Sequence, residues 1–168
     1  MKTSTSIVAA AFACAVATGL HAAPREAHSH AAHDAAAKAE QQDWGIAGDA
    51  RSARRTIEIG MSDAMRFTPS KLQVREGETV RFVVVNRGRQ PHEFVIGTRK
   101  VLDAHAALMR RFPQMDHDEP NSVRVAPGRR KTLVWTFNRP GEFAFACLLP
   151  GHYEAGMTGS IKIMSRKH

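Results

Sequence analysis

Cysteine is scarce in this sequence, which has only Cys14 and Cys147 among its 168 residues. Cys14 lies in an N-terminal apolar segment with the features of a cleavable export signal, so the processed chain is expected to keep Cys147 alone. A single cysteine cannot form an internal disulfide bond, and a fold held together by disulfides is therefore excluded. In an oxidising compartment a lone thiol is a liability unless something occupies it, and a metal ion would do so.

A hydrophobic run long enough to span a bilayer is missing as well. The N-terminal apolar stretch, Ile7–Leu20, is too short for an ordinary transmembrane helix. Lys2 precedes it and small residues follow it up to Ala22, so residues 1–22 are predicted to be a signal peptide. We therefore expect a periplasmic protein without stable membrane insertion. Lipoprotein processing at Cys14 is the alternative, although a poor lipobox precedes that residue.

Acidic residues are outnumbered, since 16 Asp and Glu face 24 Lys and Arg and the formal net charge is +8. A basic surface favours acidic partners or a negatively charged membrane surface. Nucleic acid is the other common partner of a basic chain. No recognition motif for nucleic acid accompanies the charge, and the export signal argues against such a partner.

Large apolar residues are almost absent from residues 23–52 before Trp44, and Ala, His, Glu and Gln dominate there. Such a segment cannot bury enough surface to offset its ordering entropy, so a flexible tail is predicted. Within it, His28, His30 and His33 form a His-x-His-x2-His tract. Histidine-rich tracts can bind metal, which predicts additional copper in the tail. The alternative is a solvated spacer.

Residues 53–168 show a different pattern, with short alternating apolar runs separated by turn residues. This pattern is typical of a β-sandwich or barrel, and we predict an all-β Greek-key sandwich. The predicted strands are 56–59, 72–74, 80–85, 93–96, 122–125, 132–137, 142–147 and 160–163.

One segment departs from the strand pattern. Lys100–Phe112 places Val101, His105, Leu108 and Phe112 on one helical face, and Pro113 ends the run. We predict a short helix inserted in a connection between strands, followed by an acidic loop.

The strongest local signal is Cys147-x4-His152-x4-Met157, which lies between two predicted strands. His92 begins another predicted strand upstream, just after Pro91. Thiolate and thioether are soft ligands suited to Cu(I), and two His and one Cys with a weak axial Met form the ligand set of blue-copper sites. Each residue alone has an ordinary structural explanation. Their joint occurrence at this spacing in an exported chain predicts one copper bound by His92, Cys147, His152 and Met157.

These residues resemble those of the cupredoxins over roughly Arg55–Met164. The loop from Cys147 is similar to that of plastocyanin, azurin and rusticyanin, and its spacing is nearest to that of rusticyanin. Residues 44–48, 61–69 and 92–98 also resemble the CopI-type copper-tolerance cupredoxins. That resemblance implies a type 1 copper site in a periplasmic protein that helps Gram-negative bacteria survive excess copper.

Two functions follow from this resemblance. The first is copper tolerance or homeostasis by binding or redox handling of copper ions, with an acidic redox partner or a copper-export component as partner. The second is an electron carrier between a redox donor and a terminal reductase or oxidase. The histidine tract favours the first. The sequence departs from many cupredoxins at Glu93, where they carry Asn or Ser; its backbone N–H could still donate to the Cys147 sulfur.

An enzyme is not expected. Multicopper oxidases and nitrite reductases need further copper centres and several such domains, and a binuclear centre needs a second cysteine in the loop. A purely structural sandwich would leave the Cys-His-Met loop unexplained. A second site for Cu(I) is possible near the end of the predicted helix, where Met109, Met115 and His117 occur. Ordinary packing of methionine in a small core is the competing interpretation.

Overall fold

The computed structural model describes residues 39–114 and 119–165. The predicted signal peptide lies outside these residues, and so do His28, His30 and His33 of the tail and Met115 and His117 of the acidic loop. Among the described residues, the chain forms two five-stranded sheets and one α-helix.

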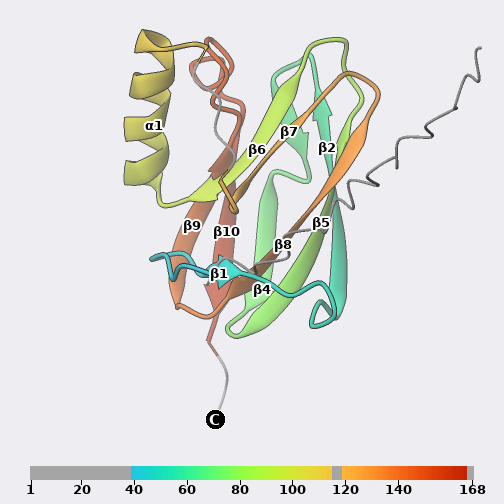
Figure 1. Cartoon of the computed structure of the whole chain (residues 1–168), viewed down its shortest axis with the longest axis vertical. Helices are drawn as coiled ribbons and strands as arrows, with labels where there is room; N and C mark the ends of the chain where they lie inside the picture. The colour runs from blue at the N-terminus through green and yellow to red at the C-terminus, as the bar shows by residue number, and fades with distance from the viewer. Residues whose placement is uncertain (1–38, 115–118, 166–168) are drawn as a thin grey trace, which may run out of the picture. The chain divides into compact units, whose positions relative to one another are not determined.

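The two sheets pack as a sandwich (Figure 1). The first has the order β1-β8-β5-β2-β3, and the second has the order β4-β10-β9-β6-β7. β2 pairs with β5 and β4 with β10 in parallel, and the other ladders are antiparallel. The predicted all-β sandwich is confirmed. The strands are β1 (Ile46–Ala47), β2 (Arg55–Ser62), β3 (Arg66–Thr68), β4 (Lys71–Arg75), β5 (Glu78–Asn86), β6 (His92–Gly97), β7 (Ser122–Val125), β8 (Arg130–Phe137), β9 (Gly141–Ala146) and β10 (Thr158–Met164).

Alternating burial along the strands builds the core between the sheets. In β5, Phe82 points inward and its ring centroid lies 5.3 Å from that of Phe94 in β6, so the contact joins the two sheets. Phe94 in turn lies 5.1 Å from Phe145 of β9, in the same sheet. Gly159 in β10 faces Phe145 so closely that a Cβ there would lie 2.1 Å from the ring. Aromatic contacts of this kind add to the stability that burial of the rings already provides.

The helix α1 (Arg99–Arg111) begins with Thr98, whose hydroxyl accepts a hydrogen bond from the Val101 N–H. It lies against the outer face of the second sheet (Figure 1) and buries Leu102, Ala106 and Met109. The strand residues beneath it are small, because Ala144 and Ala146 alternate with the inward aromatic residues of β9. No helix of the described chain is long and apolar enough to cross a membrane.

The helix confirms the prediction of its position, and the face that it buries is not the one marked by the apolar stripe identified in the sequence. Val101, Leu108 and Phe112 are 38%, 40% and 54% exposed, so the apolar stripe that they share does not contact the sheet. The helix has two apolar stripes, and the one with Ala106 in its centre packs closely against the alanines of β9.

The folded region begins earlier than predicted. Trp44 is 6% exposed and belongs to the core, and its carbonyl accepts a hydrogen bond of 3.0 Å from Trp135 Nε1. Gly45 has a φ of 128°, and a Cβ at this position would lie 2.3 Å from the Thr136 carbonyl oxygen. β1 follows directly and pairs with β8. The predicted tail of residues 23–52 is therefore too long at its C-terminal end.

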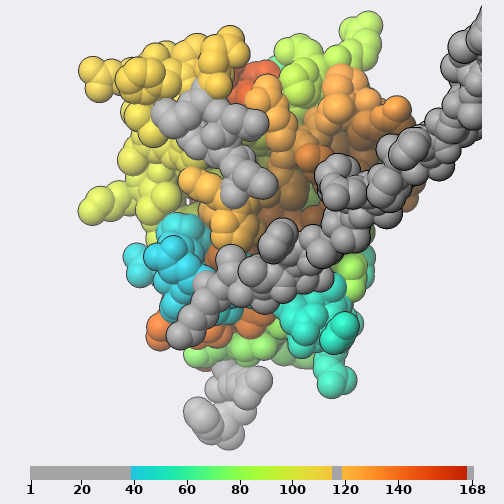
Figure 2. Space-filling view, in the orientation of Figure 1, coloured from blue at the N-terminus to red at the C-terminus, as the bar shows by residue number. Residues whose placement is uncertain are grey.

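Three connections meet at one end of the sandwich. They are the β2–β3 turn, the β5–β6 connection and the loop from β9 to β10, which lie together at the top of Figure 1. In the space-filling view the red loop after β9 lies between α1 and the yellow-green β5–β6 connection (Figure 2). This end of the molecule holds the residues predicted to bind copper.

Candidate metal centre

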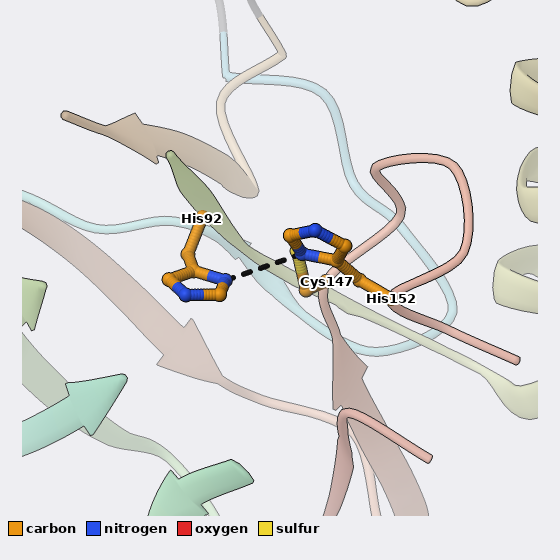
Figure 3. A group of neighbouring side chains, drawn as sticks. All are labelled: His92, Cys147 and His152. Carbon is orange, nitrogen blue, oxygen red and sulfur yellow. Dashed lines mark hydrogen bonds between the residues drawn. The ribbon is translucent and has the colours of Figure 1, made fainter. Parts of the chain in front are cut away.

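Three of the predicted ligands converge at the end of the second sheet. His92 is the first residue of β6, and Cys147 directly follows the last residue of β9. β6 and β9 are paired, so two residues far apart in the sequence come side by side. His152 reaches them from the loop between β9 and β10. Their ligand atoms all lie within 4.8 Å of one another, and all three residues are buried (Figure 3).

The donor atoms are spaced as a single ion requires. Nδ1 of His92 lies 3.2 Å from Nδ1 of His152, which lies 3.3 Å from the Cys147 sulfur. One ion can reach all three at about 2.0–2.3 Å, the usual length of metal–nitrogen and metal–sulfur bonds. Two imidazoles and a thiolate suit copper in both oxidation states. The residues present therefore fit a copper ion.

The ligand loop (residues 147–157) is held by its own backbone. The Cys147 N–H donates to the Met157 carbonyl at 3.1 Å, and the Met157 N–H donates to the His152 carbonyl at 3.0 Å. Gly151 and Gly156 have φ values of 83° and 85°, which glycine adopts without steric cost. The loop thus closes on itself and turns both Cys147 and His152 inward.

Met157 lies at the closing end of this loop, just before β10, and is 0% exposed. A buried thioether at this point, next in the chain to a paired strand, agrees with the prediction that Met157 is the weak axial ligand. Its ligation stays a prediction.

The Cys147 sulfur also accepts a hydrogen bond from the chain beside it. The Glu93 N–H donates to Sγ at 3.3 Å, which confirms the donation expected from the sequence. The Glu93 carboxylate lies 3.9 Å from Arg124 Nε on the neighbouring strand β7. The residue that replaces the more usual Asn or Ser therefore keeps the backbone contact to the sulfur.

Burial controls the protonation of these donors. Burial raises the pKa of Cys147 to about 12, against the lowering effect of the N–H groups of Glu93 and Leu149. Without a metal the sulfur is therefore a neutral thiol, and a bound metal ion replaces its proton. Burial, followed by the neighbouring His92, lowers the pKa of His152, which favours the neutral imidazole that a metal needs.

Two further residues that support the site were not identified from the sequence. Asn86 is buried, and its amide donates to the carbonyls of Gln90 and Val125 at 2.7 and 2.9 Å. Asp63 of the β2–β3 turn accepts the Arg89 N–H, and that hydrogen bond is the main reason why the pKa of its carboxyl is lowered. Asn in a turn is a recognisable local signal. The sequence around Asp63 contains no such signal, because the residues that Asp63 contacts are distant in the sequence.

The proposed second copper site has one described member. Met109 is buried in the cluster between α1 and the second sheet, together with Leu102 and Ala106. Its predicted partners Met115 and His117 lie outside the described residues, as do His28, His30 and His33 of the tail.

The family model for copper binding proteins of the plastocyanin/azurin family matches residues 53–164. The chain belongs to this family. Its cofactor is copper, and His92, Cys147 and His152 form a cluster able to hold the ion.

Curated relatives of this cupredoxin share much of its length. It is 51% identical to the copper-resistant cuproprotein CopI of Rubrivivax gelatinosus over 81% of this chain and 84% of that protein. It is 35% identical to the protein of the same name from Pseudomonas aeruginosa, over 76% of this chain and 86% of that one.

Solved structures of cupredoxins show the same fold. Auracyanin from Roseiflexus castenholzii matches with a TM-score of 0.58 and 23% identity over 67% of this chain and 98% of its own. Auracyanin B matches with a TM-score of 0.60 and 21% identity over 71% and 96%.

Met157→Leu provides a test of the axial ligand in this cupredoxin. We expect the variant to keep copper and its visible band, because the two histidines and the thiolate remain. Its reduction potential should rise, since a weak donor to Cu(II) is lost. Met164→Leu is the matched control, because Met164 is 43% exposed at the end of β10. Equal potentials for the two variants, measured by voltammetry, would mean that Met157 does not touch the metal.

Proposed function

We propose that this protein is a periplasmic type 1 copper protein that acts in copper tolerance by binding copper or changing its oxidation state. The observation that carries the proposal is the buried convergence of His92, Cys147 and His152. The name of the curated relatives, copper-resistant cuproprotein CopI, supports copper tolerance as the role.

The site is suited to hold copper in either oxidation state. His92 and Cys147 lie at the ends of paired strands, and side chains from β3 and α1 hold the ligand loop in place. Arg66 of β3 donates to the Ala155 carbonyl at 3.0 Å, and Arg110 of α1 pairs with Glu154 at 2.8 Å. Donors held in this way reorganise little when the charge of the ion changes, which favours both tight binding and rapid electron exchange.

His152 is the ligand that lies nearest to the solvent. It is 9% exposed, whereas His92 and Cys147 are each 0% exposed. A copper ion or an electron would therefore pass by the His152 side of the site.

The formal net charge of +8 favours an acidic partner. The side chains of Arg87, Arg89 and Arg110 at this end are 58%, 97% and 54% exposed, although each also pairs with a carboxylate of this chain. An acidic redox protein or an acidic copper-export component would be attracted to such a surface. A second function is electron transfer between a donor and a terminal reductase or oxidase. It would use the same solvent-facing ligand, His152, and the same end of the molecule.

Three further parts of the proposal concern the whole chain. Export by residues 1–22 would place the protein in the periplasm, and the histidine tract of the tail would add copper capacity there. The protein would bind copper without acting as an enzyme, because a single cupredoxin domain with one cysteine in its loop holds one such centre.

A growth test separates the two functions. We expect a strain that lacks this protein to grow normally in ordinary medium and to stop growing at added copper concentrations that the parent tolerates. The natural chain and Met164→Leu should restore growth, and Cys147→Ser should not. Loss of respiration at ordinary copper, without copper sensitivity, would instead establish the electron carrier and contradict the tolerance role.

A further inference from the structure

The carboxylate of Asp63, which is not one of the predicted copper ligands, lies near the ring nitrogen of His92 that points away from the other ligands. Oδ1 of Asp63, in the β2–β3 turn, lies 3.4 Å from Nε2 of His92. This nitrogen is buried, and apart from Asp63 it has no hydrogen-bond partner within the described part of the chain. The opposite nitrogen of the same ring, Nδ1, points toward His152. The imidazole therefore stands between the donor cluster on one side and a carboxylate on the other.

Backbone hydrogen bonds hold the carboxylate of Asp63 close to His92. Its two carboxylate oxygens accept the Arg89 N–H at 3.0 and 2.8 Å, and Oδ1 also accepts the Gln90 N–H at 3.2 Å. Gln90 is only two residues before His92. A Cβ at Gly88 would lie 2.1 Å from Oδ1, so the carboxylate can come this close only because glycine occupies that position.

We propose that Asp63 is the positioning residue of the copper ligand His92 and that its negative charge favours Cu(II) over Cu(I) in the site. Histidines that bind metals commonly present their second ring nitrogen to a carboxylate, which fixes the tautomer and makes the ligating nitrogen more basic. A proton on Nε2 leaves Nδ1 free to bind copper. A more basic donor stabilises the more highly charged ion. This inference rests on the proposed function, since it needs copper bound at His92.

Asp63 could instead serve only to hold the turn before His92. Asp63→Asn separates the two roles, because the amide keeps an oxygen for the N–H groups of Arg89 and Gln90 and loses the charge. We expect Cu(II) affinity to fall about 10- to 100-fold, the usual effect of losing such a partner. Cu(I) affinity should fall less. Each tenfold loss of Cu(II) affinity relative to Cu(I) affinity raises the one-electron reduction potential by about 59 mV.

Glu58→Gln is the matched control. Glu58 lies on β2, in the strand that leads to Asp63, and its carboxylate pairs with Arg87. The substitution removes the same charge without touching His92, so its potential and its ratio of Cu(II) to Cu(I) affinity should equal those of the natural protein. Gly88→Ala is a second variant, since it keeps Asp63 and displaces its carboxylate; it should raise the potential as Asp63→Asn does.

The measurements are voltammetry and chelator competition for Cu(I) and Cu(II) on the full processed chain, with the visible band as the sign that Cys147 holds the ion. The proposal is overturned if Asp63→Asn and Gly88→Ala both match Glu58→Gln in potential and affinity ratio. Failure of the proposed function gives a different result, because the natural protein would then lack the band altogether.

Discussion

The Cys147→Ser protein should be colourless after addition of Cu(II), whereas we expect the natural protein to show intense visible absorption. The band arises when charge moves from the thiolate to Cu(II), and a serine hydroxyl does not ionise at neutral pH to replace it. The Cys147 sulfur lies 3.3 Å from His152 Nδ1, and it is the one thiolate donor among the three donor atoms that lie within 4.8 Å of one another. Its removal should therefore also weaken copper binding by orders of magnitude.

The substitution should leave the fold intact. Serine is close in size to cysteine, and the Glu93 N–H can donate to its hydroxyl as it does to the sulfur. An unsatisfied buried hydroxyl would cost about 1–3 kcal/mol, and the available partner keeps the loss below that range. Thermal unfolding of the metal-free proteins checks this point. Cys14→Ser in the precursor is the matched control, since cleavage of the proposed signal peptide would remove that residue. A visible band that survives Cys147→Ser would refute the assignment of the site.

Copper affinity should increase by about a factor of ten for each unit of pH between pH 7 and 9, or about 100-fold over that range. The sign follows from burial, which raises the pKa of Cys147 to about 12. The metal-free thiol is therefore protonated throughout this range, and each copper that binds displaces one proton. The lowered pKa of His152 means that its imidazole is already neutral there and adds no further proton.

Chelator competition at several pH values measures this slope, and an indicator in weak buffer counts the released protons directly. One proton per copper is expected for the natural protein and none for residual binding by Cys147→Ser. A natural protein that releases no proton would show that the thiol is already ionised, which would contradict the argument from burial.

The sequence alone predicted the β-sandwich and the loop that holds the candidate copper ligands. Alternation located the long strands, because one face of each is buried, and the spacing from Cys147 to His152 fits a loop between paired strands. β1 and β3 were missed, since Ile46–Ala47 and Arg66–Thr68 are too short for alternation to show. Trp44 falls within the predicted tail because its burial depends on tertiary packing, which the local sequence does not show.

Other features depend on contacts that a linear pattern does not contain. The helix α1 has two apolar stripes, and the alanines of β9 decide that Ala106 rather than Leu108 faces the sheet. Asp63 faces His92 because the β2–β3 turn and the β5–β6 connection meet at one end of the sandwich. Nothing in the residues around Asp63 could have predicted that meeting.

The close fit of Gly159 against Phe145 links the visible absorption expected of the copper site to the packing of the interior. Phe145 stands two positions before Cys147 on β9, and its ring also packs against Phe67 and Phe94. A bulkier residue at position 159 would push this ring and tilt the end of β9, which leads directly into Cys147. Searches for variants with altered copper handling should therefore include the aromatic interior, where a spectral change can begin without any change of ligand.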